Sequence, residues 1–371
     1  MKSNKTFAFL SLLAMGMSLA SCGETPVSKE DLARSRGFVA AMKKGEDAYN
    51  GLGFKTSFKQ QYGVAYVDEN EDSKTDYQYD YSAEGSVTMA YRLGANATFD
   101  FAKCFDEGGF YLVGDQKENA KLTSTSAGKG ETPKGDRSFK EDYSFHHIFG
   151  IQFDQSDFYA QGNHDLTDRI VPSNDSDVFQ GHIARSSIQG VASKTVKGSI
   201  DRILYMNAWQ EVSSFRLAMG RYFAGLDLTS DDLAADFYRH HKITFAEENG
   251  VLHAEFSLDA GTVFSAIGGK DAGIDARIQG KADIDQANLR VTSYSFDFKD
   301  AYVSVLKKRL SGKKTHNLNI ETFVLRGELE DFRYEDLHLS GKFVDYSSEQ
   351  VNEFIEGYEA HVIPHLTGVS H

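Results

Sequence analysis

Apolar and polar residues alternate along much of this chain, and such alternation is typical of β-strands with one buried face. It runs through residues 54–67 and 75–93, on either side of the acidic turn DENEDSK. Residues 241–258 alternate on both sides of Asn249-Gly250, the strongest short signal for a β-hairpin. Further strands are expected within the ranges 273–300, with a turn near 285–288, 316–329 and 334–347.

Three short segments carry the signature of a helix start, in which a serine or threonine side chain accepts a hydrogen bond from a backbone amide. The capping residues are Ser28, Thr229 and Ser347, each with apolar residues placed around it for a hydrophobic staple. A fourth segment has apolar residues at every third or fourth position, which makes one stripe for docking on a sheet. The predicted helices span 28–50, 199–223, 229–240 and 347–362.

These elements predict a β-rich α+β protein with curved antiparallel sheets and a few docked helices. The stretch 115–142 is polar and is interpreted as a long surface loop or a lid. The helix over 199–223 separates two β-rich halves. The expected organisation is a signal peptide over 1–21, a tether and N-terminal helix over 22–50, a β-rich domain over 51–198, and a helix-plus-sheet domain over 199–371.

The N-terminus has the features of a secretory signal. Lys2 and Lys5 precede an uncharged apolar stretch over 7–19, which is too short to span a bilayer comfortably. The next residues, Leu19-Ala20-Ser21-Cys22, resemble the lipobox of bacterial lipoproteins. The resemblance implies cleavage before Cys22, a diacylglyceryl thioether on its sulfur and usually acylation of its amine by a fatty acid such as palmitate. The alternative is an ordinary signal peptide in which the cysteine occurs by chance.

The lipobox resemblance also implies a location for the protein. The acyl chains on Cys22 would hold it on the extracytoplasmic side of the cell membrane or of an outer membrane, because two or three chains anchor firmly where one does not. Gly23 is compatible with sorting to an outer membrane, since it is not the aspartate of the retention signal. The sequence does not distinguish a Gram-positive from a Gram-negative envelope.

The chain has two cysteines, Cys22 and Cys104. They would form a disulfide only if the leader had another role, so lipidation of Cys22 leaves Cys104 without a partner. Cys104 follows Phe99 and Phe101 in a run interpreted as a strand, which indicates a small buried thiol. A catalytic thiol would need a neighbouring base and some exposure.

Charge and motifs exclude several function classes. The formal net charge of −14 argues against nucleic-acid binding and against adhesion to anionic lipid, both of which need a basic surface. The sequence lacks the glycine-rich phosphate and dinucleotide motifs, the zinc-protease motif and the G-x-S-x-G nucleophile motif. No cofactor and no metal site are indicated, and catalysis is the less favoured interpretation.

Histidines are the remaining candidates for chemistry. His146-His147 and His164-Asp165 lie in two alternating segments. Adjacent residues on a strand face opposite sides, so one member of the first pair would join His164 and Asp165 only if the two strands are neighbours. Such a set would suit a surface hydrolase or zinc, but surface or hydrogen-bonded histidines explain the same residues.

Tyr77, Tyr79 and Tyr81 are the candidate ligand-binding residues. In the segment DYQYDY they occupy every second position and therefore share one face of a strand. Tyrosine offers broad apolar contact plus a hydroxyl, so the row would suit a binding groove. The same pattern would arise where a sheet face packs on a helix.

The C-terminal half, with a helix followed by long hairpins, is similar in pattern to the LolA/LppX-type lipoprotein carriers, whose half-open sheet encloses lipid. The resemblance implies a non-catalytic lipoprotein that binds an apolar ligand or an envelope partner, and it transfers no ligand residues. Two alternatives stay open: a surface hydrolase that uses His164 and Asp165, and a structural or interaction lipoprotein.

Overall fold

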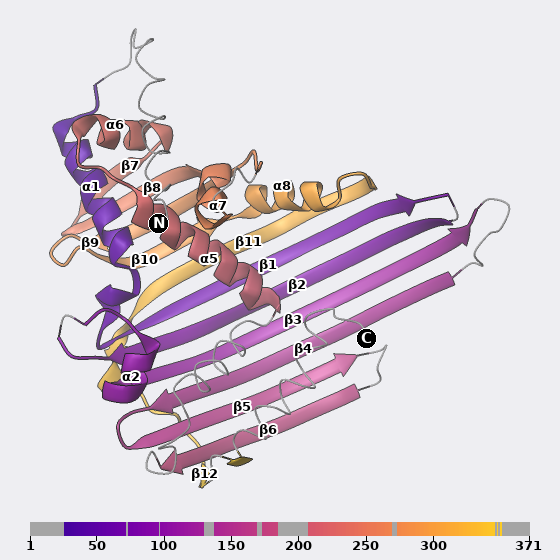
Figure 1. The fold of residues 1–371 in the computed structure, drawn as a ribbon, viewed down its shortest axis with the longest axis horizontal. Coiled ribbons are helices and arrows are strands. Elements are labelled where there is room, and N and C mark those ends of the chain that lie inside the picture. The colour runs from indigo at the N-terminus through magenta and orange to yellow at the C-terminus, as the bar shows by residue number, and fades with distance from the viewer. Residues whose placement is uncertain are drawn as a thin grey trace, which may run out of the picture.

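The computed structural model describes residues 26–71, 73–95, 97–129, 137–168, 173–184, 207–268, 273–345, 347 and 349–350. Its centre is one open, mostly antiparallel sheet of twelve strands in the order β12-β6-β5-β4-β3-β2-β1-β11-β10-β9-β8-β7 (Figure 1). Helices cover part of one face, which makes a β-rich α+β fold. The predicted fold class is therefore confirmed in its coarse form, with a single sheet in place of several.

The first six strands form a meander. Five of the later strands extend the sheet beside the first strand, and the last strand of the chain lies beside the sixth. The meander contains β1 (Leu52–Glu69), β2 (Ser73–Arg92), β3 (Gly109–Gly128), β4 (Arg137–Phe153), β5 (Asp157–Asp168) and β6 (Ser173–Ala184). The remaining strands are β7 (Thr244–Glu248), β8 (Val251–Asp259), β9 (Arg277–Asp285), β10 (Arg290–Asp297), β11 (Lys314–Arg333) and β12 (Val344–Asp345). Because β11 pairs with β1, strands from both sides of the expected division near 198 lie in one sheet.

Helices occur before β1, between β2 and β3, between β6 and β7, and between some of the later strands. The helices are α1 (Lys29–Lys44), α2 (Phe101–Glu107), α5 (Asn207–Gly225), α6 (Asp231–His240), α7 (Ala260–Gly268) and α8 (Lys299–Arg309), with short 3-10 turns η1 (Gly45–Tyr49) and η2 (Tyr334–Asp336). Of these, α1, α5 and α6 correspond to predicted helices, whereas α2, α7 and α8 were not predicted. Residues 199–206 and 351–362 of the other expected helical spans lie outside the described residues.

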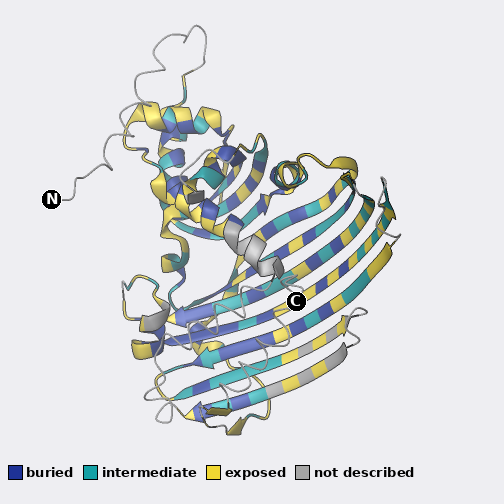
Figure 2. Ribbon diagram, turned by 45° about the vertical axis from the view of Figure 1, so that its right-hand side comes forward, coloured by how far each residue is buried: buried dark blue, intermediate teal, exposed yellow. Residues whose placement is uncertain are grey.

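The inner face of the sheet is the face on which the helices pack. One row of apolar side chains crosses the sheet from β8 to β1. Phe256 of β8 and Phe296 of β10 both pair with Gly280 of β9. Leu325 of β11 lies between Phe296 and Phe58 of β1. Phe38 of α1 and Phe223 of α5 both contact Phe256, and Phe215 of α5 contacts Phe323 of β11. Buried and exposed positions alternate along the curved strands in Figure 2. Burial of this apolar row stabilises the fold through the hydrophobic effect.

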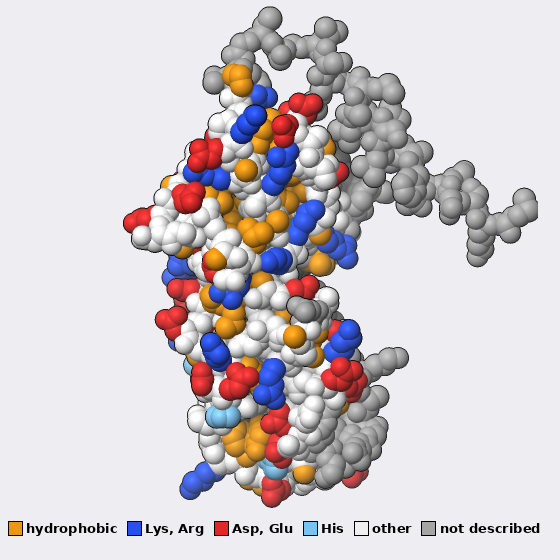
Figure 3. Space-filling model, turned by 90° about the vertical axis from the view of Figure 1, so that its left-hand side faces the viewer, with side chains coloured by type: hydrophobic (Ala, Val, Ile, Leu, Met, Phe, Trp, Pro, Cys, Tyr) orange, Lys and Arg blue, Asp and Glu red, His pale blue; other side chains and the backbone are white. Residues whose placement is uncertain are grey.

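Much of the outer face is polar, apart from a small apolar cluster of Ala90, Tyr111 and Tyr334. Lys59 of β1 and Glu84 of β2 are exposed there, with nitrogen and oxygen 3.9 Å apart. The end of the molecule that carries α1 and α2 has a similar character. Its surface hydrophobic side chains gather in small groups among lysines, arginines and acidic residues (Figure 3).

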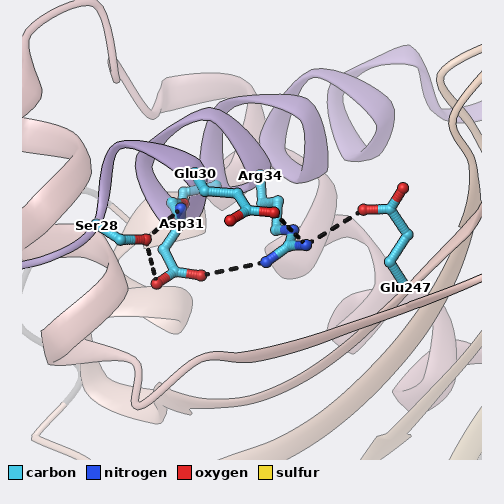
Figure 4. Close-up of polar contacts among 6 residues, drawn as sticks. Ser28, Glu30, Asp31, Arg34 and Glu247 are labelled. Atoms are coloured by element: carbon cyan, nitrogen blue, oxygen red, sulfur yellow. Dashed lines mark hydrogen bonds and ion pairs between the residues drawn. The ribbon is translucent and has the colours of Figure 1, made fainter.

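The first predicted helix cap is present at α1. Ser28 Oγ accepts a hydrogen bond from the Asp31 amide at 3.0 Å and donates one to the Asp31 carboxylate at 2.7 Å. Arg34 reaches Glu30 at 2.8 Å and Glu247 of β7 at 3.3 Å, so the capped turn is also tied to the sheet edge (Figure 4). At Ser347 the predicted capping box is present as well, with Gln350 bonded to the Ser347 amide.

Two local predictions are wrong. The cap of α6 is Ser230 rather than Thr229, because the Ser230 hydroxyl accepts from the Leu233 amide while the Thr229 amide donates to Asp227. Cys104 lies on helix α2 rather than on a strand. It is a fully buried free thiol, as expected, and burial raises its pKa to about 12.

The interpretation of 115–142 as a loop or lid is also wrong. Residues 115–128 continue β3 and residues 137–142 begin β4, and the two strands pair from Phe110↔Phe153 to Ser126↔Arg137. Residues 130–136 are outside the described part of the chain. Pairing across the sheet satisfies the backbone of this polar segment, although its side chains supply little hydrophobic driving force.

The segment after β11 was expected to be a strand and is mostly irregular. It crosses the outer face, where Leu339 lies over Gly150 of β4. It then reaches β6, with which only Val344 and Asp345 form a parallel strand pair. His182 of β6 holds this end, with Nδ1 at 2.7 Å from Asp345 and Nε2 at 2.8 Å from Asp157 of β5. We call these three residues the histidine latch.

The histidine latch is expected to weaken as pH rises. Only the imidazolium form donates from both nitrogens, and the hydrogen bonds to Asp345 and then Asp157 raise the pKa of His182 above its ordinary value. Its contribution is therefore complete below about pH 6.5 and is lost as pH rises through the raised pKa. Hydrogen exchange of the Val344 and Asp345 amides, corrected for intrinsic rates, should show less protection above that pKa.

The latch has a matched control. His182→Gln should remove the pH dependence at Val344, whereas His253→Gln should keep it, since His253 pairs with Asp283 at 2.7 Å in a different part of the sheet. Protection at Val344 that is independent of pH in the unmodified chain would contradict the interpretation.

Candidate functional site

The predicted tyrosine row lies on the inner face of β2 and is matched by tyrosines on β1. Tyr81 lies opposite Tyr62, and Tyr77 lies opposite Tyr66. The Tyr66 and Tyr77 rings stack with centroids 4.8 Å apart, and the Tyr62 and Tyr81 rings are 5.1 Å apart. Two strands therefore carry one continuous aromatic surface, here called the tyrosine face: Tyr62, Tyr66, Tyr77, Tyr79 and Tyr81.

One end of the tyrosine face is covered by helix α8. Tyr302 of α8 lies with its ring 5.4 Å from that of Tyr62, and it also contacts Phe323 of β11. Tyr81 is 8 % exposed and belongs to the core, whereas Tyr66 and Tyr77, farther toward the β1–β2 turn, are half-buried. The row thus serves partly as packing surface and partly as accessible surface.

The hydroxyl groups of Tyr66, Tyr79 and Tyr81 stay neutral at ordinary pH. Burial raises the pKa of Tyr66, Tyr79 and Tyr81 above the usual value, with further contributions from neighbouring tyrosines. A neutral phenol both donates and accepts one hydrogen bond. The surface can therefore contact hydrocarbon with its rings and a polar group with its hydroxyls.

Next to the tyrosine face, β3 and β4 place a polar group on the same inner surface. Glu118 is fully buried, and its Oε1 accepts a hydrogen bond from the Tyr143 hydroxyl at 2.6 Å. Gln116, also fully buried, has its Nε2 3.4 Å from Glu118 Oε2. We call Gln116, Glu118 and Tyr143 the acceptor cluster, because carboxylate and amide oxygens dominate it.

Sequence reasoning missed the acceptor cluster because Gln116 and Glu118 lie in the segment interpreted as a loop. Polar residues occupy both faces of β3 at this point, so the alternation that marks a strand is absent from GDQKEN. One signal was available. Ala120 and Leu122, two and four positions after Glu118, continue the inner face of β3 with apolar side chains.

The histidine candidates lie on two neighbouring strands. Strands β4 and β5 pair with His146 opposite Asp165 and His147 opposite His164. Alternation places His146 on the outer face and His147 on the inner face. His146 bonds to Asp115 at 3.0 Å on the outer face, while His147 is buried between Phe145 and Phe149. Across the described residues, no group of three or more histidine, cysteine or acidic side chains is arranged to hold a metal ion.

The outer face has an open groove of about 500 Å³ over β11, β1, β2 and β3. Its lining is polar, with Gln61, Asn119 and Asn319 among the side chains and Gly63 at a position without one. This groove and the tyrosine face lie on opposite sides of the same strands, because Gln61 and Tyr62 are adjacent. The groove is solvated sheet surface, in keeping with the polar outer face.

Comparisons with protein-family models, with curated proteins and with solved structures find no match for this chain. Among the helices that the structure describes, none combines the length and the apolar character that crossing a lipid bilayer requires. The case for a function therefore depends on the sheet and its inner face.

Proposed function

We propose that this protein is a lipid-anchored extracytoplasmic lipoprotein that binds an apolar ligand, without catalysis, on the inner face of its sheet. The observation that carries the proposal is the tyrosine face, which continues the buried aromatic row beyond α8 as half-buried surface. Apolar surface of this kind gains free energy when a ligand removes it from water, by about 25 cal/mol per Å². The Cys22 anchor would keep the binding face close to a membrane.

Two features support a ligand rather than a catalytic role. The inner face is lined by rings and by neutral hydroxyls, which suit hydrocarbon with a few polar contacts. The two described histidines of the hydrolase alternative are separated by the sheet, since His146 bonds to Asp115 on the outer face and His147 is buried between Phe145 and Phe149. An envelope protein as the bound partner is an outcome that the experiment below distinguishes.

The test uses residues 22–371 with Cys22→Ser, the chain that leader cleavage would leave, which retains every described residue. Native mass spectrometry and solvent extraction should recover bound lipid, and the emptied protein should take up a fluorescent fatty alcohol. A protein recovered empty that also takes up no fatty probe would overturn the proposal. A stable envelope protein retained in its place would favour the interaction alternative.

A pair of variants locates the ligand. Changing both Tyr66 and Tyr77 to alanine removes the stacked pair, and we expect affinity for the fatty alcohol to fall about tenfold or more. Tyr238→Ala on α6 is the control, since Tyr238 is half-buried against Phe245 at the other end of the sheet. Equal loss in both proteins would indicate a general effect on folding instead.

A further inference from the structure

A second groove, of about 630 Å³, lies over strands β7 to β11 (Figure 1). Its lining includes Glu255 of β8 and Ser295 of β10, which directly precede the inward-facing Phe256 and Phe296 and therefore face outward. We call it the β7–β11 groove. It lies on the opposite side of the sheet from the tyrosine face, and the exposure of lining residues such as Arg326 leaves room for a ligand.

Arg326 of β11 is a cation of this groove that has no carboxylate opposite it. The residues directly opposite are Ser295 of β10 and Ser57 of β1. In the same row, Lys281 lies opposite Glu255 and forms an ion pair with it at 2.5 Å. Within the described part of the chain, the Arg326 side chain makes no hydrogen bond or ion pair. Because a guanidinium stays charged at physiological pH, the groove offers a positive charge that no neighbour neutralises.

Lys242 supplies a second such cation at the other end of the groove. It follows α6 and is exposed, and its ammonium has no partner among the described residues. Strands β7 and β11 are about 19 Å apart, at about 4.8 Å for each strand between them. The lining also holds Asp297, whose Oδ1 accepts a hydrogen bond from the Lys299 amide at 2.9 Å. With three cations and two carboxylates, the lining is net positive on a chain whose formal net charge is −14.

The rest of the lining distinguishes among anionic ligands. Thr244, Gln279 and Ser295 provide hydroxyl and amide groups that both donate and accept hydrogen bonds. Strands β8 to β10 are paired on both sides, so their backbone offers no edge to an added peptide strand. A single inorganic anion would fill little of the groove, and its polar lining does not suit a hydrocarbon chain. A sugar chain with acidic groups matches both the length and the lining.

We propose that the β7–β11 groove binds an acidic oligosaccharide, with the carboxylate of one sugar on Arg326 and that of another on Lys242. The planar guanidinium can donate two parallel hydrogen bonds to a carboxylate, which makes Arg326 the main contact. Gln279 and Ser295 bond the sugar hydroxyls between the two cations. This site is on the opposite face from the apolar site proposed above and does not depend on it.

The experiment is isothermal titration calorimetry at low ionic strength on residues 22–371 carrying Cys22→Ser. The probes are tetragalacturonate, the galacturonate monomer, neutral maltotetraose and the acidic peptide tetraglutamate. Tetragalacturonate should bind about tenfold or more tightly than maltotetraose, because hydrogen bonds to a charged group are stronger than neutral ones. Its binding should weaken as salt is added, since the two cations are exposed.

Arg326→Gln should lower the affinity for tetragalacturonate about tenfold or more and leave maltotetraose binding unchanged. The matched control is Arg333→Gln, which removes the same charge from an exposed position farther along β11, outside the groove. Lys242→Gln should weaken binding of the tetramer but not of the monomer, because the monomer reaches Arg326 alone. Thermal unfolding verifies that each variant is folded.

Several results would overturn the assignment. One is equal affinity for tetragalacturonate and maltotetraose, and another is tetragalacturonate binding that is unchanged in Arg326→Gln. Equal losses in Arg326→Gln and Arg333→Gln would indicate a general effect of charge. Tighter binding of tetraglutamate would assign the groove to an acidic peptide, and no binding of any probe would leave it without a ligand of this class. The fatty alcohol measures the inner face separately, so its uptake decides the proposed function whatever the sugars do.

Discussion

Replacing Phe38 with alanine is expected to lower the free energy of unfolding by about 3–5 kcal/mol. Phe38 is fully buried on α1, and its ring contacts those of Phe223, Phe237 and Phe256 at 5.6, 6.3 and 5.0 Å. These partners belong to α5, α6 and β8. One side chain therefore joins three elements to α1, and its loss leaves a cavity that none of them can fill alone.

Chemical denaturation measures this change, and an exposed phenylalanine supplies the control. Phe139 at the start of β4 is 43 % exposed, so Phe139→Ala should cost less than about 1 kcal/mol. The same substitution at the two sites separates loss of packing from loss of a phenyl ring as such. A Phe38→Ala midpoint close to that of Phe139→Ala would show that α1 is not part of the cooperative core.

The hairpins could be predicted from sequence because their determinants are local. Asn249 and Gly250 have the positive φ values, 52° and 81°, that the tight turn requires, and strands β7 and β8 follow on either side. The turn between β9 and β10 likewise lies at the predicted position, between Asp285 and Arg290. The tyrosine face could be predicted in part for the same reason, since Tyr77, Tyr79 and Tyr81 share a face by alternation alone.

Long-range pairing could not be predicted in the same way. The inner positions of β3 hold Gln116 and Glu118 and its outer positions hold Asp115 and Lys117, so neither face is marked as buried. What makes this segment a strand is its place between β2 and β4. Similarly, the pairing of β11 with β1 joins residues more than two hundred positions apart in the chain, and no local pattern reports it.

For the same reason, one part of the candidate site could be predicted from the sequence and the other could not. Its aromatic part follows from local periodicity, and Tyr62 and Tyr66 could be added once β1 and β2 were paired through their turn. Its polar part could not, because Tyr143 and Glu118 meet only through the β3–β4 register. Alternation also correctly separated the two residues of His146-His147, which face opposite sides.

Replacing Cys22 with alanine is expected to move the protein from the membrane fraction to the soluble fraction. Under the proposed function Cys22 is the attachment point of the lipid, and residue 22 lies outside the described part of the chain. Each buried CH2 of an acyl chain contributes about 0.8 kcal/mol, so removing two or three chains abolishes firm anchoring. Metabolic labelling with an alkyne fatty acid should give a signal for the unmodified chain and none for the variant.

Cys104→Ala is the matched control, because it removes the other cysteine and leaves the lipobox intact. Cys104 is fully buried and its thiol has a raised pKa, so it is a poor acceptor for a fatty acyl group. This variant should keep both the label and the membrane location. If Cys22→Ala stays in the membrane fraction with its label, the anchor lies elsewhere and the lipobox assignment is wrong. If it loses the label but remains membrane-bound, the protein is held there by a partner, which would favour the interaction alternative over the binding of a free ligand.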